Sequence, residues 1–215
     1  MTGRPPRRSR AEITAAAVAI ADRDGIEAAS MRQVAAALGT GAASLYRYVQ
    51  TREDLLDLMT DSMAAEYVLG PPTGDWIGDL VDVGQQAREI MRRHPWLADL
   101  TTRRPALGPR GLALLEHVLE VLAACPASAA AKLESFAVLM AITAVFVQAE
   151  LGGDAPAQRS AAYLQEALAS GEYPRLGELL ADAAPPPADP PPNPADRFGE
   201  ILARILAGLL GPGPG

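Results

Sequence analysis

Apolar side chains recur along this chain at intervals of three and four residues, which is the period of amphipathic helices. Residues that break helices separate these stripes, most clearly at Asp24-Gly25, His94-Pro95 and Cys125-Pro126. The last stripe comprises Phe198, Ile201, Leu202, Ile205, Leu206 and Leu209. The pattern predicts an all-α protein, with a small N-terminal helical unit and a larger helical body.

The stretch from Ser30 to Arg52 predicts two short helices joined by a tight turn. The first helix has a single apolar face, made of Met31, Val34, Ala35 and Leu38. Gly39 and Gly41 then permit positive φ in the turn. The next helix, about Ala42 to Val49, carries small residues first, and then a hydroxyl, two phenols and a guanidinium. Such a helix can approach a phosphate backbone and the floor of a groove, so we interpret the stretch as a helix-turn-helix.

The surface positions of this stretch are the candidate DNA contacts. Arg32 and Arg47 can reach bases or phosphates, whereas Ala42 and Ala43 allow close approach and can touch thymine methyl groups. The hydroxyl, the phenols and the last arginine are assigned mainly to phosphates, which position a protein on DNA without reading its sequence. The full set is Arg32, Gly41, Ala42, Ala43, Ser44, Tyr46, Arg47, Tyr48 and Arg52.

Several fixed residue types stand at fixed spacing in this region. Leu38-Gly39, the segment LYRYV at 45–49 and the segment TREDLL at 51–56 together resemble the DNA-binding domain of the tetracycline-repressor (TetR) family. In that family an LG turn leads into an LY-x-[HY] recognition helix and then into a [KR]-[DE]-x-LL helix. The resemblance implies a sequence-specific transcriptional repressor that a small-molecule effector releases from a palindromic operator in double-stranded DNA.

The resemblance also sets expectations for the DNA contact itself. Two DNA-binding units on a two-fold dimer should contact half-sites that lie roughly 34–36 Å apart. Where tetracycline repressors carry polar or ring-bearing residues at the start of the recognition helix, this chain has Ala42 and Ala43. We therefore expect fewer direct base contacts and more reliance on arginines or on DNA shape.

Proline and glycine residues divide the remaining chain. Residues 1–52 are predicted to form a basic arm and the helix-turn-helix, residues 53–69 a connecting helix, and residues 75–215 a helical ligand-binding and dimerisation domain. By the resemblance, the tilt of the connecting helix would transmit a ligand signal. Helices of the third region are predicted over 76–93, 96–100, 112–122, 128–151, 157–170 and 196–210, and the proline-rich segment 184–194 is expected to be an extended or disordered linker.

Trp76, the segment Arg93 to Leu97, Arg104-Pro105 and Arg197-Phe198-Gly199 look like the effector domain of the tetracycline-repressor class. In that class the long late helix and the C-terminal helix pair with their mates in a four-helix dimer interface. The likeness implies a homodimer through about Ala131–Leu151 and Asp196–Leu210, and an intramolecular core helix is the alternative. The expected interface residues are Leu139, Val147, Phe198, Ile201, Leu202, Ile205 and Leu209.

A ligand pocket among the central helices is a further inference. Asp82 and Gln86 lie four residues apart on one helix face. The complete expected lining is Asp82, Gln86, Trp96, Leu100, Arg103, Leu112, Glu116, Phe136, Met140 and Thr143. Val68 and Leu100 stand where the tetracycline repressor has histidines for its drug and magnesium, so that site is expected to be absent and the effector is unidentified.

The formal net charge of −7 is unevenly distributed. Residues 1–52 hold eight arginines against four carboxylates, a balance of +4, and residues 53–215 carry the remaining −11. Such asymmetry favours a polyanion-binding end on an acidic body. A basic tail without a role is the alternative.

The sequence offers little support for catalysis. Cys125 is the only cysteine, which excludes an internal disulfide and a thiolate metal site, and His94 and His117 are the only histidines. No apolar run reaches the roughly 18–20 residues that span a bilayer. We expect a cytoplasmic protein that is not an enzyme and has no cofactor, metal or membrane span. The alternatives are a TetR-like activator and a helical ligand-binding protein or enzyme that does not bind DNA.

Overall fold

The computed structural model describes residues 9–101, 108–152, 154–182 and 194–211 of the chain. Within these ranges the regular structure is helical and includes no strand, which confirms the predicted all-α fold. The helices are α1 (Arg10–Asp24), α2 (Met31–Ala37), α3 (Ala42–Leu45), α4 (Arg52–Met63), α5 (Trp76–Arg93), α6 (Pro95–Thr101), α7 (Pro109–Val121), α8 (Ala129–Leu151), α9 (Asp154–Ala169), α10 (Pro174–Asp182) and α11 (Pro194–Leu210). Short 3₁₀ helices are η1 (Ile26–Ala28) and η2 (Ala64–Glu66).

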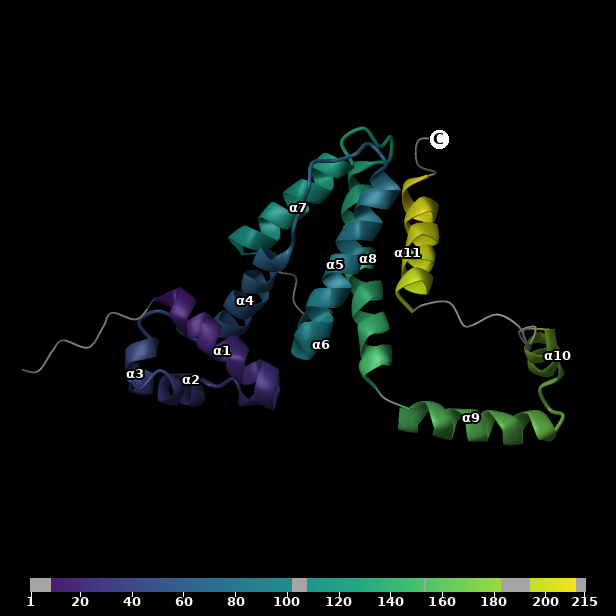
Figure 1. Ribbon diagram of the computed structural model, residues 1–215, viewed down its shortest axis with the longest axis horizontal. Coiled ribbons are helices and arrows are strands. Elements are labelled where there is room, and N and C mark those ends of the chain that lie inside the picture. Colours follow the sequence, from purple (N-terminus) through teal and green to yellow (C-terminus); the bar gives the residue numbers. More distant parts are fainter. Residues whose placement is uncertain (1–8, 102–107, 153, 183–193, 212–215) are drawn as a thin grey trace, which may run out of the picture.

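The molecule consists of a head, a body and a connecting helix between them (Figure 1). The head comprises α1, α2 and α3, and α4 leads from it into the body. In the body α5, α8 and α11 pack against one another, with α6 and α7 at their sides (Figure 1).

Side chains close in sequence cap the helix starts. Ser9 and Glu12 form a capping box at α1, and Thr51 and Asp54 form another at α4. The hydroxyl of Ser128 accepts a hydrogen bond from a backbone N–H in the first turn of α8. Each cap satisfies N–H groups that a first turn leaves without partners, so these helix starts are where the sequence predicts them.

The recognition helix is shorter than predicted. α3 ends at Leu45, and a turn carries the chain on to Tyr48. Tyr46 has ψ −13°, well away from the α-helical value of about −42°. The N–H of Tyr48 accordingly donates to the carbonyl of Leu45 at 2.8 Å, three residues back. The predicted range 42–49 is therefore one α-helical turn followed by a tighter turn.

The connecting helix also ends earlier than predicted. α4 stops at Met63 instead of continuing to residue 69, and Tyr67 is already extended, with ψ 135°. The side-chain amide of Gln86, on α5, accepts from the N–H of Val68 at 2.8 Å and donates to its carbonyl at 3.1 Å. A partner 18 residues away in sequence thus holds this segment out of the helix.

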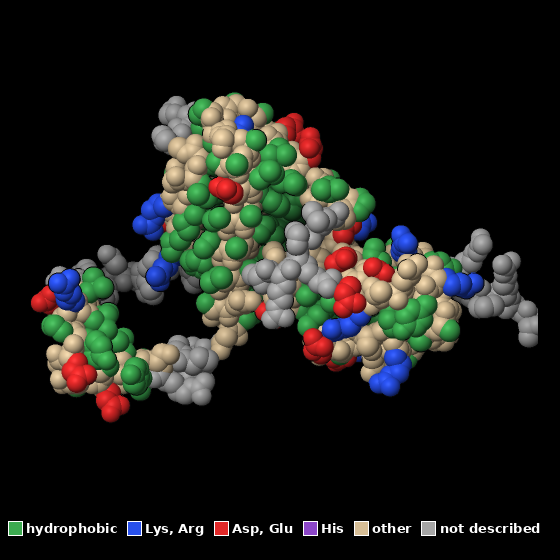
Figure 2. Space-filling model, turned by 180° about the vertical axis from the view of Figure 1, so that it is seen from behind, with side chains coloured by type: hydrophobic (Ala, Val, Ile, Leu, Met, Phe, Trp, Pro, Cys, Tyr) green, Lys and Arg blue, Asp and Glu red, His purple; other side chains and the backbone are tan. Residues whose placement is uncertain are grey.

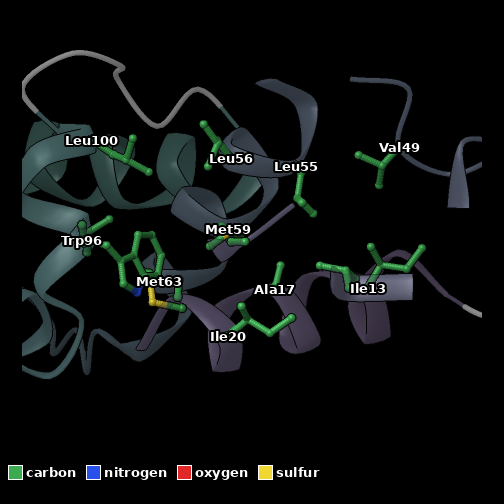
Figure 3. Close-up of a cluster of buried hydrophobic side chains, with 14 of the residues drawn as sticks. Ile13, Ala17, Ile20, Val49, Leu55, Leu56, Met59, Met63, Trp96 and Leu100 are labelled. Carbon is green, nitrogen blue, oxygen red and sulfur yellow. The ribbon is translucent and has the colours of Figure 1, made fainter. Parts of the chain in front are cut away.

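One buried apolar cluster runs from the head through α4 into the body (Figure 3). Figure 3 shows Ala17 of α1 facing Met59 of α4, with Ile13 towards Val49 at one end and Trp96 and Leu100 of α6 at the other. Burying one large apolar side chain stabilises a fold by roughly 1.5–3 kcal/mol. α4 contributes to the same cluster as α1 and α6. A displacement of α4 in the body therefore also changes the packing of α4 against α1 in the head.

A second cluster holds the body together. Phe198 and Leu202 of α11 pack against Leu80 of α5 and Leu139 of α8. Gly84 lies at the closest point between α5 and α11, where an added Cβ would collide with a methyl group of Leu202. The three long helices therefore form a tightly packed unit.

The central helix α8 requires a correction. Among the described helices it is the one long and apolar enough, by length and composition, to cross a bilayer, with 23 residues and a mean hydropathy of 1.8. The expectation that no apolar run is long enough to span a bilayer counted uninterrupted runs, whereas α8 as a whole meets this criterion of length and composition. Its packing against α5, α6, α7 and α11 makes it the central helix of the body.

The sequence missed one helix, and three others begin earlier than predicted. α7 begins at Pro109, three residues before the predicted Leu112. α10 (Pro174–Asp182) was not predicted, α9 begins three residues before the predicted Ala157, and α11 begins at Pro194 instead of Asp196. α9 and α10 extend away from the three central helices (Figure 1). The predicted linker 184–194 lies outside the described residues, except for Pro194.

Candidate nucleic-acid interface and effector-binding body

The side chain of Leu45 anchors α3 in the head. It is fully buried, and Ala42 packs half-buried against the same core. Ala43 and Arg47 are exposed, and half of the Tyr46 side chain (50%) is accessible. The predicted small-then-polar face of the recognition helix is therefore at the surface, but one of its two alanines mainly serves packing.

The turn before α3 uses its glycines differently from the prediction. Gly39 has φ +63°, as expected, but Gly41 has φ −78° and is the extended N-cap of α3. The hydroxyl of Ser44 lies 2.7 Å from the Gly41 carbonyl, to which it donates, and 2.7 Å from the hydroxyl of Thr40. These bonds fix the turn, so Ser44 has a structural role in the head as well as its predicted role at phosphate.

Two arginines make contacts around Tyr48. The guanidinium of Arg47 lies 5.9 Å from the centre of the Tyr48 ring, in cation–π geometry. Arg10 of α1 donates from Nε to the Tyr48 carbonyl at 2.9 Å. Both positive groups thereby stand next to the end of the recognition unit.

The two remaining predicted arginines differ in their surroundings. Arg32 is exposed on α2. Arg52 instead forms an ion pair with Glu27 at 3.0 Å and donates to the carbonyl of Ile26 at 3.3 Å. A phosphate would have to compete with these partners, so Arg52 secures α4 to the head in this conformation.

The pair Asp82 and Gln86 has a structural role that the sequence did not indicate. Gln86 Nε2 donates to Asp82 at 2.7 Å, and the same amide holds the backbone of Val68. Asp82 also lines a cavity of about 270 Å³ between α5, α7 and residues 69–73, next to Asp79 and His117. The pair thus secures the end of the connecting segment to α5.

The other predicted lining residues do not share one described cavity. Trp96, Leu100 and Thr143 are buried, whereas Leu112 and Glu116 are exposed on α7. Thr143 Oγ1 donates to the carbonyl of Leu139 in its own helix, and the indole N–H of Trp96 donates to Asp22 of α1 at 2.6 Å. Arg103 lies outside the described residues.

Phe136 and Met140 are partly buried on α8, where Met140 touches both apolar clusters. Tyr67 joins the same two clusters, and its hydroxyl has the Met140 sulfur as its hydrogen-bond partner at 4.0 Å. A thioether is a weak acceptor, and burial raises the pKa of the Tyr67 phenol above its ordinary value. In the sequence, Tyr67 falls within the predicted connecting helix 53–69, and no pattern there indicates a buried hydroxyl.

A groove of about 590 Å³ runs between the head and the body. Its walls are one face of α1, the adjoining face of α4 and the start of α7. At its edge, Asp61 of α4 accepts hydrogen bonds from the N–H groups of Arg110 and Gly111, both at 2.9 Å. No local residue pattern indicates this contact, because Asp61 and α7 are separated by about 50 residues.

Four of the residues predicted for a dimer interface belong to the core of this chain. Leu139, Val147, Phe198 and Leu202 have no exposed surface within the single chain, because α5 and α6 pack around Val147 and α5, α8 and α11 pack around the other three. That part of the prediction is wrong as a description of exposed contacts. Ile201 and Ile205 are half-buried and Leu209 is 36% exposed, so these three stay a prediction.

Comparisons with known proteins match both parts of this architecture. Residues 13–59 match the family model described as "Bacterial regulatory proteins, tetR family", and residues 70–211 match "Tetracyclin repressor-like, C-terminal domain". The HTH-type transcriptional repressor DrrR1 of Streptomyces coeruleorubidus is 36% identical over 97% of this chain and 82% of its own length. The chain belongs to the TetR family.

Solved structures of TetR-family proteins share its fold. Apo ActR from Streptomyces coelicolor superposes with a TM-score of 0.81 at 25% identity, covering 97% of this chain and 98% of ActR. ActR in complex with actinorhodin superposes with a TM-score of 0.77 at 27% identity, covering 95% and 98%. The resemblance inferred from the sequence is therefore confirmed, and the chain is a TetR-family transcriptional regulator.

Proposed function

We propose that this TetR-family regulator is a cytoplasmic homodimeric repressor that binds a palindromic operator through α2 and α3. The observation that carries the proposal is the surface of α3 and of the turn after it, where Tyr46 and Arg47 are accessible next to the buried anchor Leu45. Arg32 is exposed on the neighbouring helix α2. Guanidinium and phenol groups can contact phosphates and base edges, and the repressor DrrR1 has a related sequence.

The proposed dimer forms through the outer faces of α8 and α11. On α8, Ala137, Ala141 and Val145 follow one another at intervals of four residues and are all exposed. Only 28% of the most apolar stretch of α8 is buried within the chain. Figure 2 shows hydrophobic side chains gathered on the central body. A helix that is apolar on all sides needs a second partner, and a symmetric copy of α8 supplies one.

The proposed effector is an aromatic organic molecule that carries oxygen acceptors. This proposal is supported by the ActR structures with actinorhodin and with (S)-DNPA. It is also supported by the side chains that lie between α4, α5 and α8 in this chain. Phe136 and Met140 offer aromatic and thioether surface there, and the hydroxyl of Tyr67 lacks a strong acceptor. Binding would shift the dimer towards a spacing of the heads that no longer fits the operator.

The test of DNA binding is a fluorescence-anisotropy titration with the palindromic DNA upstream of the gene, at two salt concentrations. Tyr46→Ala should weaken binding by roughly tenfold, about 1.4 kcal/mol, while the salt dependence of the remaining contacts persists. Tyr163→Ala, which removes an exposed tyrosine from α9, serves as the matched control. Wild-type affinity that is equal for scrambled DNA would contradict the proposal.

The dimer is tested separately by light scattering on a sizing column. Val145→Glu places a charge on the proposed interface and should yield monomers, because an unpaired charge is costly to bury. Leu179→Glu, at an equally exposed apolar position on α10, should leave the dimer intact. If both variants have the same mass as the wild type, α8 is not the interface.

A further inference from the structure

One histidine connects the head to the body. His94 lies at the junction of α5 and α6, and its ring is nearly buried, with 13% of the side chain exposed. Its Nδ1 is 2.7 Å from a carboxylate oxygen of Asp22 in α1, and its Nε2 is 3.0 Å from a carboxylate oxygen of Glu66 in η2. The ring therefore bridges the last turn of the first DNA-binding helix and the end of the connecting segment.

The chemistry of this bridge is specific. A carboxylate accepts hydrogen bonds, and a neutral imidazole has only one N–H to donate. Both ring nitrogens of His94 nevertheless lie within hydrogen-bond distance of a carboxylate oxygen, each from a different element. Arg93 pairs with Glu66 at 2.6 Å, and Trp96 donates to the same Asp22 oxygen at 2.6 Å. Arg93, His94 and Trp96, the residues on either side of Pro95, thus hold two acidic side chains from other elements.

Apolar packing alone would not fix the head as precisely. The cluster that joins α1, α4 and α6 is held by the hydrophobic effect, which has no direction, and methionines such as Met59 and Met63 adapt readily to small shifts. Figure 3 shows Met63 beside Trp96 in this region. Charge-assisted hydrogen bonds require defined distances and angles. The bonds to Asp22 and Glu66 therefore determine how α1 and η2 are positioned on the junction of α5 and α6.

We propose that His94 is the positioning residue that fixes the orientation of the DNA-binding head on the body, by holding Asp22 of α1 and Glu66 of η2 at the same time. Its significance for operator release rests on the proposed function, whereas its effect on the geometry of the chain does not. An effector that moves the end of α5 would displace His94 and so free the head.

The test is a distance measurement between two spin labels within one chain, one at Ala36→Cys on α2 and one at Glu116→Cys on α7. Both positions are exposed, and Cys125 is buried. An excess of unlabelled protein removes distances between chains. His94→Leu and Asp22→Ala should each broaden the distance distribution at least twofold. Asp24→Ala removes a neighbouring, exposed carboxylate of α1 and should leave the width unchanged.

Equal widths in the wild type, His94→Leu, Asp22→Ala and Asp24→Ala would overturn the proposal. If His94→Leu fails to fold, Asp22→Ala decides, because that side chain is partly exposed at the end of a helix. A second control, Arg93→Ala, breaks the other contact of Glu66 without touching α1 and should keep the narrow distribution. Operator affinity is measured on the same variants, and a fivefold to tenfold loss is expected only where the distribution broadens. Absence of operator binding in the wild type would refute the proposed function and leave the distance result standing.

Discussion

Replacing Asp61 with alanine should destabilise the protein substantially, because this side chain caps a helix that is remote in sequence. The N-cap of α7 is Gly108, which has no side chain to donate or accept, and Pro109 follows it. Asp61 of α4 instead accepts from the N–H groups of Arg110 and Gly111, at the positions that an N-cap side chain normally satisfies. A Cβ at Gly108 would collide with Asp61, so the glycine leaves space for this contact.

The magnitude follows from the groups left without partners. Losing an N-cap costs about 0.5–2 kcal/mol, and each buried donor without an acceptor costs about 1–3 kcal/mol. Asp61 is 9% exposed and borders the groove of about 590 Å³, from which water can reach part of the site. We therefore expect a loss of roughly 2–4 kcal/mol in the free energy of unfolding for Asp61→Ala. Asp61→Asn keeps an acceptor oxygen and should lose only about 1 kcal/mol.

The assay is urea unfolding followed by circular dichroism, with the midpoint of thermal unfolding as a second measure. For a chain of this size 1 kcal/mol corresponds to roughly 2–4 °C, so Asp61→Ala should lower the midpoint by about 4–16 °C. Glu120→Ala, an exposed carboxylate on α7 itself, should change the unfolding free energy by no more than about 0.5 kcal/mol. An Asp61→Ala variant as stable as Glu120→Ala would refute the capping argument.

Two further predictions concern buried polar groups. At neutral pH, Tyr67→Phe should change stability by less than about 1 kcal/mol, because the hydroxyl bonds only to a sulfur at 4.0 Å. Burial raises the pKa of this phenol, so the stabilisation that comes from keeping it protonated is complete below the unfolded pKa of about 10 and is lost as the pH rises above it. Above pH of about 10 the free energy of unfolding of the wild type should fall by up to roughly 1.4 kcal/mol per pH unit. The Tyr67→Phe variant should lose less over the same range, and Tyr163→Phe is the control. Arg88 is 4% exposed and pairs with Glu150 at 2.8 Å, so Arg88→Met should cost about 2–4 kcal/mol by urea unfolding. The double variant with Glu150→Gln should recover part of that loss, and additive losses would contradict the pairing.

Local chemistry explains why the helix starts were predictable. Ser9, Thr51 and Ser128 cap helices through backbone groups within three residues, so the signal lies in the sequence itself. The helix ends were not predictable in the same way. α4 stops at Met63 because Gln86 and His94, both on other elements, bind the residues that follow it. Information of this kind is absent from any short window of sequence.

The candidate DNA contacts could be located from the sequence because their residue types and spacing are fixed by one short motif. The effector site could not, because its members come from several helices whose register depends on packing. Asp82 and Gln86 do lie on one helix face, as their spacing predicts, but they secure the backbone of Val68. Tyr67, which lies at the contact of the two apolar clusters, reads in the sequence as one more residue on an apolar helix face.

The orientation of the apolar helix α8 also depends on packing and could not be predicted from the sequence. The sequence correctly indicated that α8 has more apolar surface than one neighbour can cover, but it could not say which side faces inward. α5 and α11 pack over Leu139, and α5 and α6 pack over Val147, which leaves Ala137, Ala141 and Val145 exposed on the opposite side. Small side chains at intervals of four residues let a second helix approach closely. The residues proposed to mediate association of two chains are therefore the ones that the apolar pattern alone ranks lowest, and Val145→Glu tests that proposal directly.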